Sequence, residues 1–154
     1  DRIRAAGLDR TIADAVRAGT PYLGFCLGLQ LLFDISYEYG QHKGLGILPG
    51  KVVRFVEPPA GDAERIKIPH IGWNQVRLRG GNCPLLAGVD DGAHFYFDHS
   101  YHVVPADESI VATTTEYGGE FVSAVWKNNI FASQFHPEKS QTLGLKILEN
   151  FVRL

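Results

Sequence analysis

The segment that most constrains the fold is residues 21–33, which read Pro-Tyr-Leu-Gly-Phe-Cys-Leu-Gly-Leu-Gln-Leu-Leu-Phe. Its apolar character predicts a short buried strand, a tight turn and then an apolar helix that reaches about residue 35. Cys26 stands in the turn between Gly24 and Gly28, and glycines permit a cramped backbone and a close approach of substrate. The N–H groups at the helix start would favour the thiolate. This segment alone is compatible with an exposed nucleophile or with a small buried core residue.

The elements around this turn predict an α/β fold. Apolar residues at helical spacing indicate an amphipathic helix over 2–18, stopped by Gly19, and a last helix over 140–154. A glycine-punctuated loop is expected at 40–50 and an exposed turn at 57–62. Short apolar or alternating runs predict strands at 22–25, 51–55, the second half of 66–78, 93–98 and 101–104, and a meander at 109–116, 120–127 and 130–135. Together these elements predict a parallel core sheet with an antiparallel extension.

Composition narrows the class of protein. A length of 154 residues fits one domain, and a net charge of -2 with scattered basic residues gives no electrostatic case for nucleic acid or anionic membrane. No apolar run approaches the roughly 20 residues of a membrane span, and no apolar stretch of a signal peptide follows the first residues. Cys26 and Cys83 are expected to be reduced thiols, which favours a cytoplasmic location.

The start of the sequence leads to an expectation about what precedes residue 1. The sequence contains no Met, and only one strand is predicted before the turn at Cys26. Because a single strand ahead of that turn would make a thin α/β sheet, we expect further βα units before residue 1.

A thiol nucleophile needs a base, and the base needs an orienting group. His136 follows the apolar strand at 130–135 and precedes Pro137, and Glu138 could accept a hydrogen bond from its imidazole. A solvated His-Pro-Glu at a helix entry has the same spacing, so the residues alone leave both interpretations open.

A metal site is not expected. His99 and His102 are three residues apart, but they lie in segments predicted as strand and turn, where the two side chains diverge. No Cys-x-x-Cys or His-Glu-x-x-His motif accompanies them.

Two motifs carry a resemblance to a known family. The segment 24–30, Gly-Phe-Cys-Leu-Gly-Leu-Gln, resembles the nucleophile motif of class I glutamine amidotransferases, and 134–138, Gln-Phe-His-Pro-Glu, matches the other half of that family's triad. Segments 69–74, 96–103 and 139–141 are similar to the glutaminase subunits of imidazole glycerol phosphate synthases. The resemblance implies a three-layer α/β fold with a mixed sheet and a nucleophile elbow. It also implies that residues 1–154 form a partial amidotransferase domain that lacks the first βα units.

The resemblance also implies an activity. Cys26 would attack the side-chain amide of L-glutamine, His136 would be the base and Glu138 would orient it. Leu27 would supply one oxyanion donor through its N–H, and the second donor is expected from a glycine-rich loop before residue 1. The implied substrate-binding residues are Leu27, Gly28, Gln30, His99, Ser100 and Tyr101, of which Ser100 and Tyr101 would act through their backbone.

Ammonia would pass to a cyclase partner, a (β/α)8 barrel that makes imidazole glycerol phosphate in histidine biosynthesis. No metal or organic cofactor is implied. The residues implied to face the partner are Pro69, His70, Ile71, Gly72, Trp73, Asn74 and Tyr96. Two alternatives remain open: an amidotransferase of anthranilate or guanylate synthesis, and an inert fragment that only binds the partner.

Overall fold

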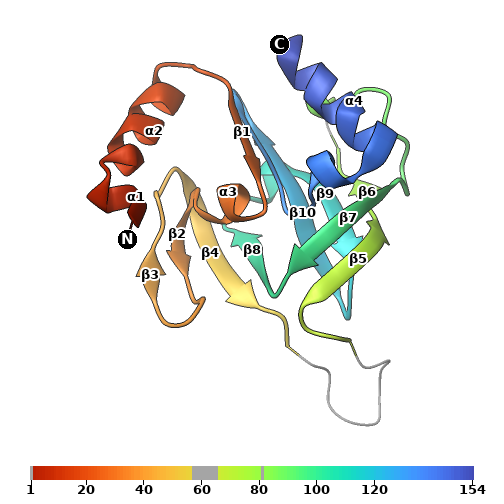
Figure 1. Ribbon diagram of the computed structural model, residues 1–154, viewed down its shortest axis with the longest axis horizontal. Coiled ribbons are helices and arrows are strands. Elements are labelled where there is room, and N and C mark those ends of the chain that lie inside the picture. The colour runs from red at the N-terminus through yellow and green to blue at the C-terminus, as the bar shows by residue number, and fades with distance from the viewer. Residues whose placement is uncertain (1, 57–65, 81) are drawn as a thin grey trace.

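The structure is a computed structural model that describes residues 2–56, 66–80 and 82–154 (Figure 1). The exposed turn predicted at 57–62 lies outside the described residues. The strands are β1 (Tyr22–Phe25), β2 (Phe33–Ser36), β3 (His42–Lys43), β4 (Leu48–Arg54), β5 (His70–Gln75), β6 (Arg77–Leu78), β7 (His94–His99), β8 (Tyr101–Pro105), β9 (Val111–Glu116), β10 (Glu120–Lys127) and β11 (Ile130–Ser133). The helices are α1 (Arg2–Ala5), α2 (Leu8–Arg17), α3 (Leu27–Gln30) and α4 (Gln141–Val152), with 3-10 turns η1 (Pro84–Leu86), η2 (Glu108–Ile110) and η3 (Pro137–Lys139).

The main sheet is mixed. Nine of the described strands form it, in the order β1-β11-β10-β8-β4-β2-β3, with β9 paired to β10 and β6 paired to β9. Strands β5 and β7 form a separate antiparallel pair. Among the described strands only β1–β11 and β2–β4 pair in parallel, so the prediction of a parallel core sheet was wrong. The short returns at 118–119 and 128–129 make β9, β10 and β11 antiparallel neighbours, as the meander prediction expected.

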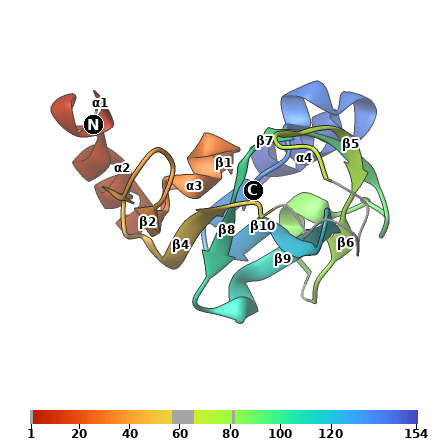
Figure 2. The same cartoon turned by 90° about the horizontal axis from the view of Figure 1, so that it is seen from below.

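Helices α1, α2 and α4 lie at two ends of the molecule, and α3 lies between them. Figures 1 and 2 show α1 and α2 on the side of β2 and β3, and α4 on the opposite side beside β5 and β7. The single helix predicted over 2–18 is divided at Gly7, whose φ of 68° is left-handed. Leu8 at the start of α2 is exposed, whereas Val16 near its other end is buried in the core.

The helix predicted to follow Cys26 is much shorter than expected. It ends at Gln30, and Phe33 begins strand β2, which pairs with β4 through the Phe33–Leu48 register. A helix of that length would bury Leu27 and Leu32 on one face; Leu32 is buried, as is Leu29, but Leu27 is 56% exposed. A short apolar run fits helix and strand equally well, and pairing with β4 decides between them.

The core has two parts. One is aromatic and includes Phe95, Phe97 and Phe135, against which Ile147 of α4 packs. The other lies around Leu29, Leu32 and Phe33 and spreads over β4, β8 and β11. The loop predicted at 40–50 contains β3 and the first residues of β4. Both parts of the core take residues from β11, with Phe131 in the first and Ile130 and Ala132 in the second.

Candidate active site

The turn at Cys26 is held by backbone geometry. Strand β1 pairs in parallel with β11, with Phe25 opposite Ser133, and both strands end there. The Cys26 N–H donates to the Ser133 carbonyl at 2.7 Å. Cys26 has φ 49° and ψ -102°, a conformation that a non-glycine residue adopts only when its surroundings impose it. Parallel pairing therefore brings the segments that follow β1 and β11 to the same edge of the sheet.

Gly24 is required by close packing around this turn. A Cβ on Gly24 would lie 2.8 Å from the Gly28 carbonyl carbon and 2.7 Å from Tyr22 Cε1. The Tyr22 hydroxyl also donates to the Gly28 carbonyl at 2.8 Å, which ties α3 back to β1. Gly24 thus allows the first turn of α3 to fold onto the strand that precedes it.

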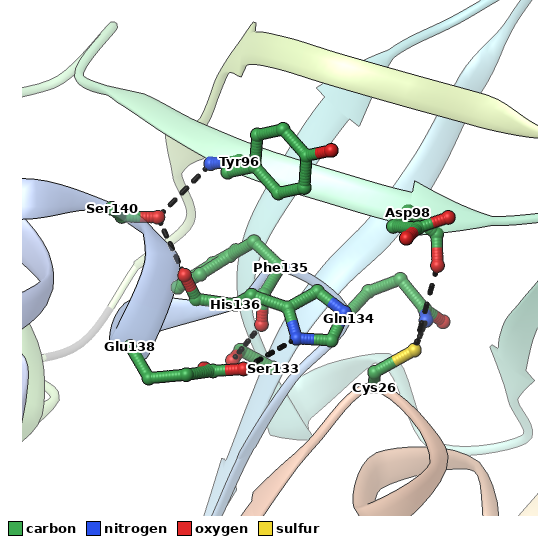
Figure 3. Close-up of polar contacts among 9 residues, drawn as sticks. All are labelled: Cys26, Tyr96, Asp98, Ser133, Gln134, Phe135, His136, Glu138 and Ser140. Atoms are coloured by element: carbon green, nitrogen blue, oxygen red, sulfur yellow. Dashed lines mark hydrogen bonds and ion pairs between the residues drawn. The ribbon is translucent and has the colours of Figure 1, made fainter.

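His136 is oriented by three contacts, two of which are drawn in Figure 3, those with Glu138 and Ser140. Its Nδ1 lies 2.7 Å from Glu138 Oε1, its backbone N–H donates to the Tyr96 carbonyl at 2.9 Å, and its carbonyl accepts from the Ser140 hydroxyl at 2.6 Å. Because a carboxylate can only accept, Nδ1 carries the proton and Nε2 is left for other contacts. Figure 3 shows the imidazole between Glu138 and Cys26.

The sulfur of Cys26 has two polar neighbours. The thiol donates to the Asp98 carbonyl at 3.8 Å, and Gln134 Nε2 donates to Sγ at 3.5 Å (Figure 3). Within the described ranges no hydrogen bond joins Sγ to the His136 imidazole. The thiol hydrogen must therefore turn away from the Asp98 carbonyl before it can pass to the imidazole.

Burial raises the pKa of the Cys26 thiol, and the negative charges of Asp98 and Glu138 raise it further. The Leu27 N–H and the Gln134 side chain act in the opposite direction and lower this pKa. The N–H at the start of α3 thus favours the thiolate, as predicted, but burial outweighs it and the net direction is upward. The four-residue helix contributes too few aligned N–H groups to offset burial.

The residues predicted to bind substrate divide into two groups. Leu27 and Gly28 begin α3 beside the sulfur. Gln30 is buried, and its Nε2 donates to the Tyr101 carbonyl at 3.0 Å and to Gln134 Oε1 at 3.1 Å. The Ser100 carbonyl already accepts from the Phe55 N–H. The side chain of Gln30 therefore acts inside the protein, between the β7–β8 turn and Gln134.

His99 was predicted to bind substrate, but its buried ring is fully occupied by the protein. Its Nδ1 lies 2.8 Å from the Tyr101 carbonyl and its Nε2 lies 3.0 Å from His70 Nδ1. Burial lowers the pKa of His99 to about 3 and that of His70 to about 4, so both rings are neutral near pH 7. The carbonyl can only accept, so His99 Nδ1 donates to it. His70 Nδ1 then donates to His99 Nε2, and Asn74 Nδ2 donates to His70 Nε2 at 3.2 Å.

Most of the residues predicted to face a partner lie on strand β5 or directly before it, and their exposure alternates along the chain. Pro69, Ile71 and Trp73 are exposed, with Ile71 at 58% and Trp73 at 48%. His70 points inward, which contradicts its expected place on the interface. Gly72 and Asn74 are partly buried, and Asn74 bonds to the Glu116 carbonyl. Tyr96 lies on the neighbouring strand β7, its ring 6.2 Å from that of Trp73.

Comparison with known proteins shows the family. The sequence model of "Glutamine amidotransferase class-I" matches residues 3–154. The chain belongs to this family. The family that the two motifs predicted is thereby confirmed. Membership of this family supports the prediction that the chain is an amidotransferase enzyme.

Relatives of this amidotransferase chain share much of its sequence. It is 51% identical over 151 residues to the imidazole glycerol phosphate synthase subunit HisH of Syntrophotalea carbinolica, covering 98% of this chain and 73% of that relative. The same subunit of Geobacter sulfurreducens is 48% identical over 149 residues, covering 97% and 71%. A crystal structure of a glutamine amidotransferase has a TM-score of 0.65 and 20% identity, covering 97% and 71%. That structural match confirms the predicted class of α/β fold with a mixed sheet.

Sequence reasoning missed two contacts in this amidotransferase site. Gln134 was recognised only as part of a motif, and Ser140 only as part of a similar segment. A polar residue two positions before a candidate base and at the end of a buried strand is a signal that could have drawn attention to Gln134. Its partners lie more than 100 positions away in the chain, so the pattern could not name them.

Two further properties concern the described residues. No group of three or more His, Cys, Asp and Glu side chains within 2–56, 66–80 and 82–154 could hold a metal ion. None of the helices described there is long and apolar enough to cross a membrane.

Proposed function

We propose that this chain is the glutaminase subunit of an imidazole glycerol phosphate synthase. It hydrolyses L-glutamine to glutamate and passes the ammonia to a cyclase subunit. The observation that carries the proposal is the approach of Cys26 and the His136–Glu138 pair at the ends of β1 and β11, in a chain 51% identical to a HisH subunit.

The first half of the reaction is formation of a thioester. His136 Nε2 takes the proton of the Cys26 thiol as Sγ attacks the amide carbon of glutamine. The Leu27 N–H, which already lowers the pKa of Cys26, lies where it can donate to the oxyanion. Collapse of the tetrahedral intermediate breaks the C–N bond. His136 returns its proton to the leaving nitrogen, and ammonia departs from a γ-glutamyl thioester.

The second half of the reaction is hydrolysis. His136 removes a proton from water, and the resulting hydroxide attacks the thioester carbonyl. The C–S bond breaks, glutamate forms and the sulfur recovers the proton from His136. Glu138 remains hydrogen-bonded to Nδ1 and stabilises the imidazolium that forms in each half. Because the pKa of Cys26 is raised, the thiol is protonated at rest, and the reaction depends on this base.

The face around β5 is the proposed contact with the cyclase. Pro69, Ile71 and Trp73 expose apolar side chains in a row, and Tyr96 packs beside Trp73. Aromatic and apolar residues of this kind are enriched at the centres of protein interfaces. We propose that the partner here is the (β/α)8 barrel that uses the ammonia.

The test compares glutamine with added ammonia as the nitrogen source, using the natural protein together with its cyclase. Cys26→Ala is expected to abolish synthesis of imidazole glycerol phosphate from glutamine and to leave synthesis from ammonium salts. Cys83→Ala, at a buried thiol far along the chain, is the matched control and should retain both. Glutaminase activity in Cys26→Ala would refute the mechanism.

A genetic test addresses the pathway. The natural gene should restore growth of an auxotroph that lacks the histidine-pathway glutaminase. Restoration of a tryptophan or guanine auxotroph instead would show that the ammonia goes to another acceptor.

A further inference from the structure

We propose that Gln134 positions the Cys26 sulfur in its thiolate form, and that Gln30 fixes the orientation of the Gln134 carboxamide. The inference rests on the proposed function only for the role of Cys26 as the nucleophile. The chemistry of the triad gives the buried side chain of Gln134 no role, and the proposal assigns it one.

Gln134 is built into the site by its backbone and by burial. It follows β11, its N–H donates to the Ser123 carbonyl at 2.8 Å, and its side chain is 0% exposed. Its Nε2 lies 3.5 Å from Cys26 Sγ, and Figure 3 shows it reaching the sulfur from the side opposite the elbow. A buried carboxamide is costly unless its polar atoms are bonded, so these contacts hold it in place.

The orientation of this carboxamide follows from its other partner. Gln30 Nε2 donates to the Tyr101 carbonyl, which can only accept, so the nitrogen of Gln30 must face that side. The same nitrogen lies 3.1 Å from the oxygen of the Gln134 carboxamide. The oxygen of Gln134 therefore faces Gln30, and its N–H group faces the sulfur.

The direction of this hydrogen bond has a chemical consequence. An N–H donor is bonded more strongly by a thiolate than by a thiol, so it favours loss of the proton. The Asp98 carbonyl can instead accept only from the protonated thiol. Sγ thus has one partner suited to each protonation state, and transfer of its proton to His136 leaves the negative sulfur bonded to Gln134.

The test measures the pKa of Cys26 directly, without glutamine. The rate of alkylation of Cys26 by iodoacetamide is followed by mass spectrometry between pH 6 and pH 10 in the natural protein with its cyclase. Gln134→Met keeps an unbranched buried side chain but removes the N–H donor. We expect the apparent pKa to rise and alkylation at pH 7 to slow by about tenfold, the effect of one pKa unit.

Three further variants make the result specific. Gln30→Met leaves Gln134 in place but frees its carboxamide to turn, so a smaller rise of the same sign is expected. In the Gln134→Met background the Gln30 change should add nothing to the pKa of Cys26. Gln41→Met, at an exposed residue, is the matched control and should keep the wild-type profile. Alkylation of the buried Cys83 in the same samples reports any general loosening.

The outcomes separate the two proposals. An unchanged Cys26 profile in a folded Gln134→Met protein would overturn the role of Gln134, whatever the glutaminase activity. If Gln134→Met does not fold, the profile of Gln30→Met decides, and a wild-type profile there would overturn the orienting role. A wild-type protein that lacks glutaminase activity would instead overturn the proposed function, and the measured pKa would still stand.

Discussion

Ser140 shows how a single residue positions the candidate base. Its hydroxyl donates to the His136 carbonyl at 2.6 Å and accepts from the Tyr96 N–H at 3.0 Å. The residue is only 2% exposed, so water cannot replace either partner. One hydroxyl thereby joins strand β7 to the turn that carries His136 and Glu138.

Replacement of Ser140 by Ala should therefore reduce stability and activity together. The change leaves a buried donor and a buried acceptor without partners, and each unsatisfied group costs about 1–3 kcal/mol. Urea unfolding measures the loss, and glutaminase assays should show a lower kcat. Thr142→Ala, at an exposed residue of α4, should change the free energy of unfolding by no more than about 0.5 kcal/mol. Equal stability of the two variants would contradict this role.

At the scale of elements, the contact between α4 and η3 determines where Glu138 and His136 stand. Gly144 lies in the first turns of α4 and faces the Pro137 carbonyl. A Cβ at this position would come within 1.7 Å of that oxygen and 2.6 Å of the carbonyl carbon. Both are backbone atoms, so no rotation of a side chain could relieve the overlap.

Gly144→Ala should thus displace η3 from α4. Overpacking of this kind costs about 1–3 kcal/mol, and the displaced turn carries the candidate base. We expect a lower Tm and a loss of glutaminase activity larger than the loss of folded protein explains. Leu145→Ala, at an exposed neighbouring position, serves as the control and should keep both. A crystal structure of an active Gly144→Ala protein with η3 unmoved would contradict the argument.

At the scale of the whole molecule, hydrogen bonds run from the β5–β7 pair to the elbow. They pass from Asn74 through His70 and His99 to the Tyr101 carbonyl, which also accepts from Gln30. Gln30 continues the chain to Gln134 and so to the sulfur. The exposed strand that we propose as the partner contact is therefore linked to the site through neutral buried imidazoles.

These imidazoles make stability depend on pH in a definite direction. An unfolded His has a pKa of about 6.5, whereas burial lowers that of His70 to about 4 and that of His99 to about 3. Below pH 6.5 the unfolded chain binds protons that the folded chain excludes, so stability falls as the pH is lowered toward 4. Each unit of difference in pKa corresponds to about 1.4 kcal/mol.

Urea unfolding at pH 7.5, 6.5, 5.5 and 4.5 tests this dependence. The free energy of unfolding should be largest at pH 7.5 and decline at each lower pH. A His99→Gln variant removes one of the two groups and should show a shallower decline. Thr142→Ala keeps both imidazoles and should retain the wild-type slope. A flat profile in the wild-type protein would show that the two rings are not held neutral by burial.

The sequence by itself determined the features that depend on near neighbours. Glycines flanking Cys26 allow its strained turn, and Gly118, Gly119 and Asn128 take the positive φ that the predicted turns of the meander need. The His-Pro-Glu spacing likewise places a carboxylate within reach of Nδ1, because only one residue separates His136 from Glu138. Such contacts are local, so the residue types and their order suffice to predict them.

Only the tertiary structure decided the features that depend on distant partners. The apolar run after Cys26 forms a four-residue helix and then a strand, because Phe33 pairs in parallel with β4. The side chain of His99 points inward, where it is hydrogen-bonded to His70 on another strand. The pKa of Cys26 also depends on packing, because burial raises the pKa of the thiol by more than the short helix lowers it. Burial and long-range hydrogen bonds arise only when segments far apart in the chain pack together, and no local pattern encodes which segments will meet.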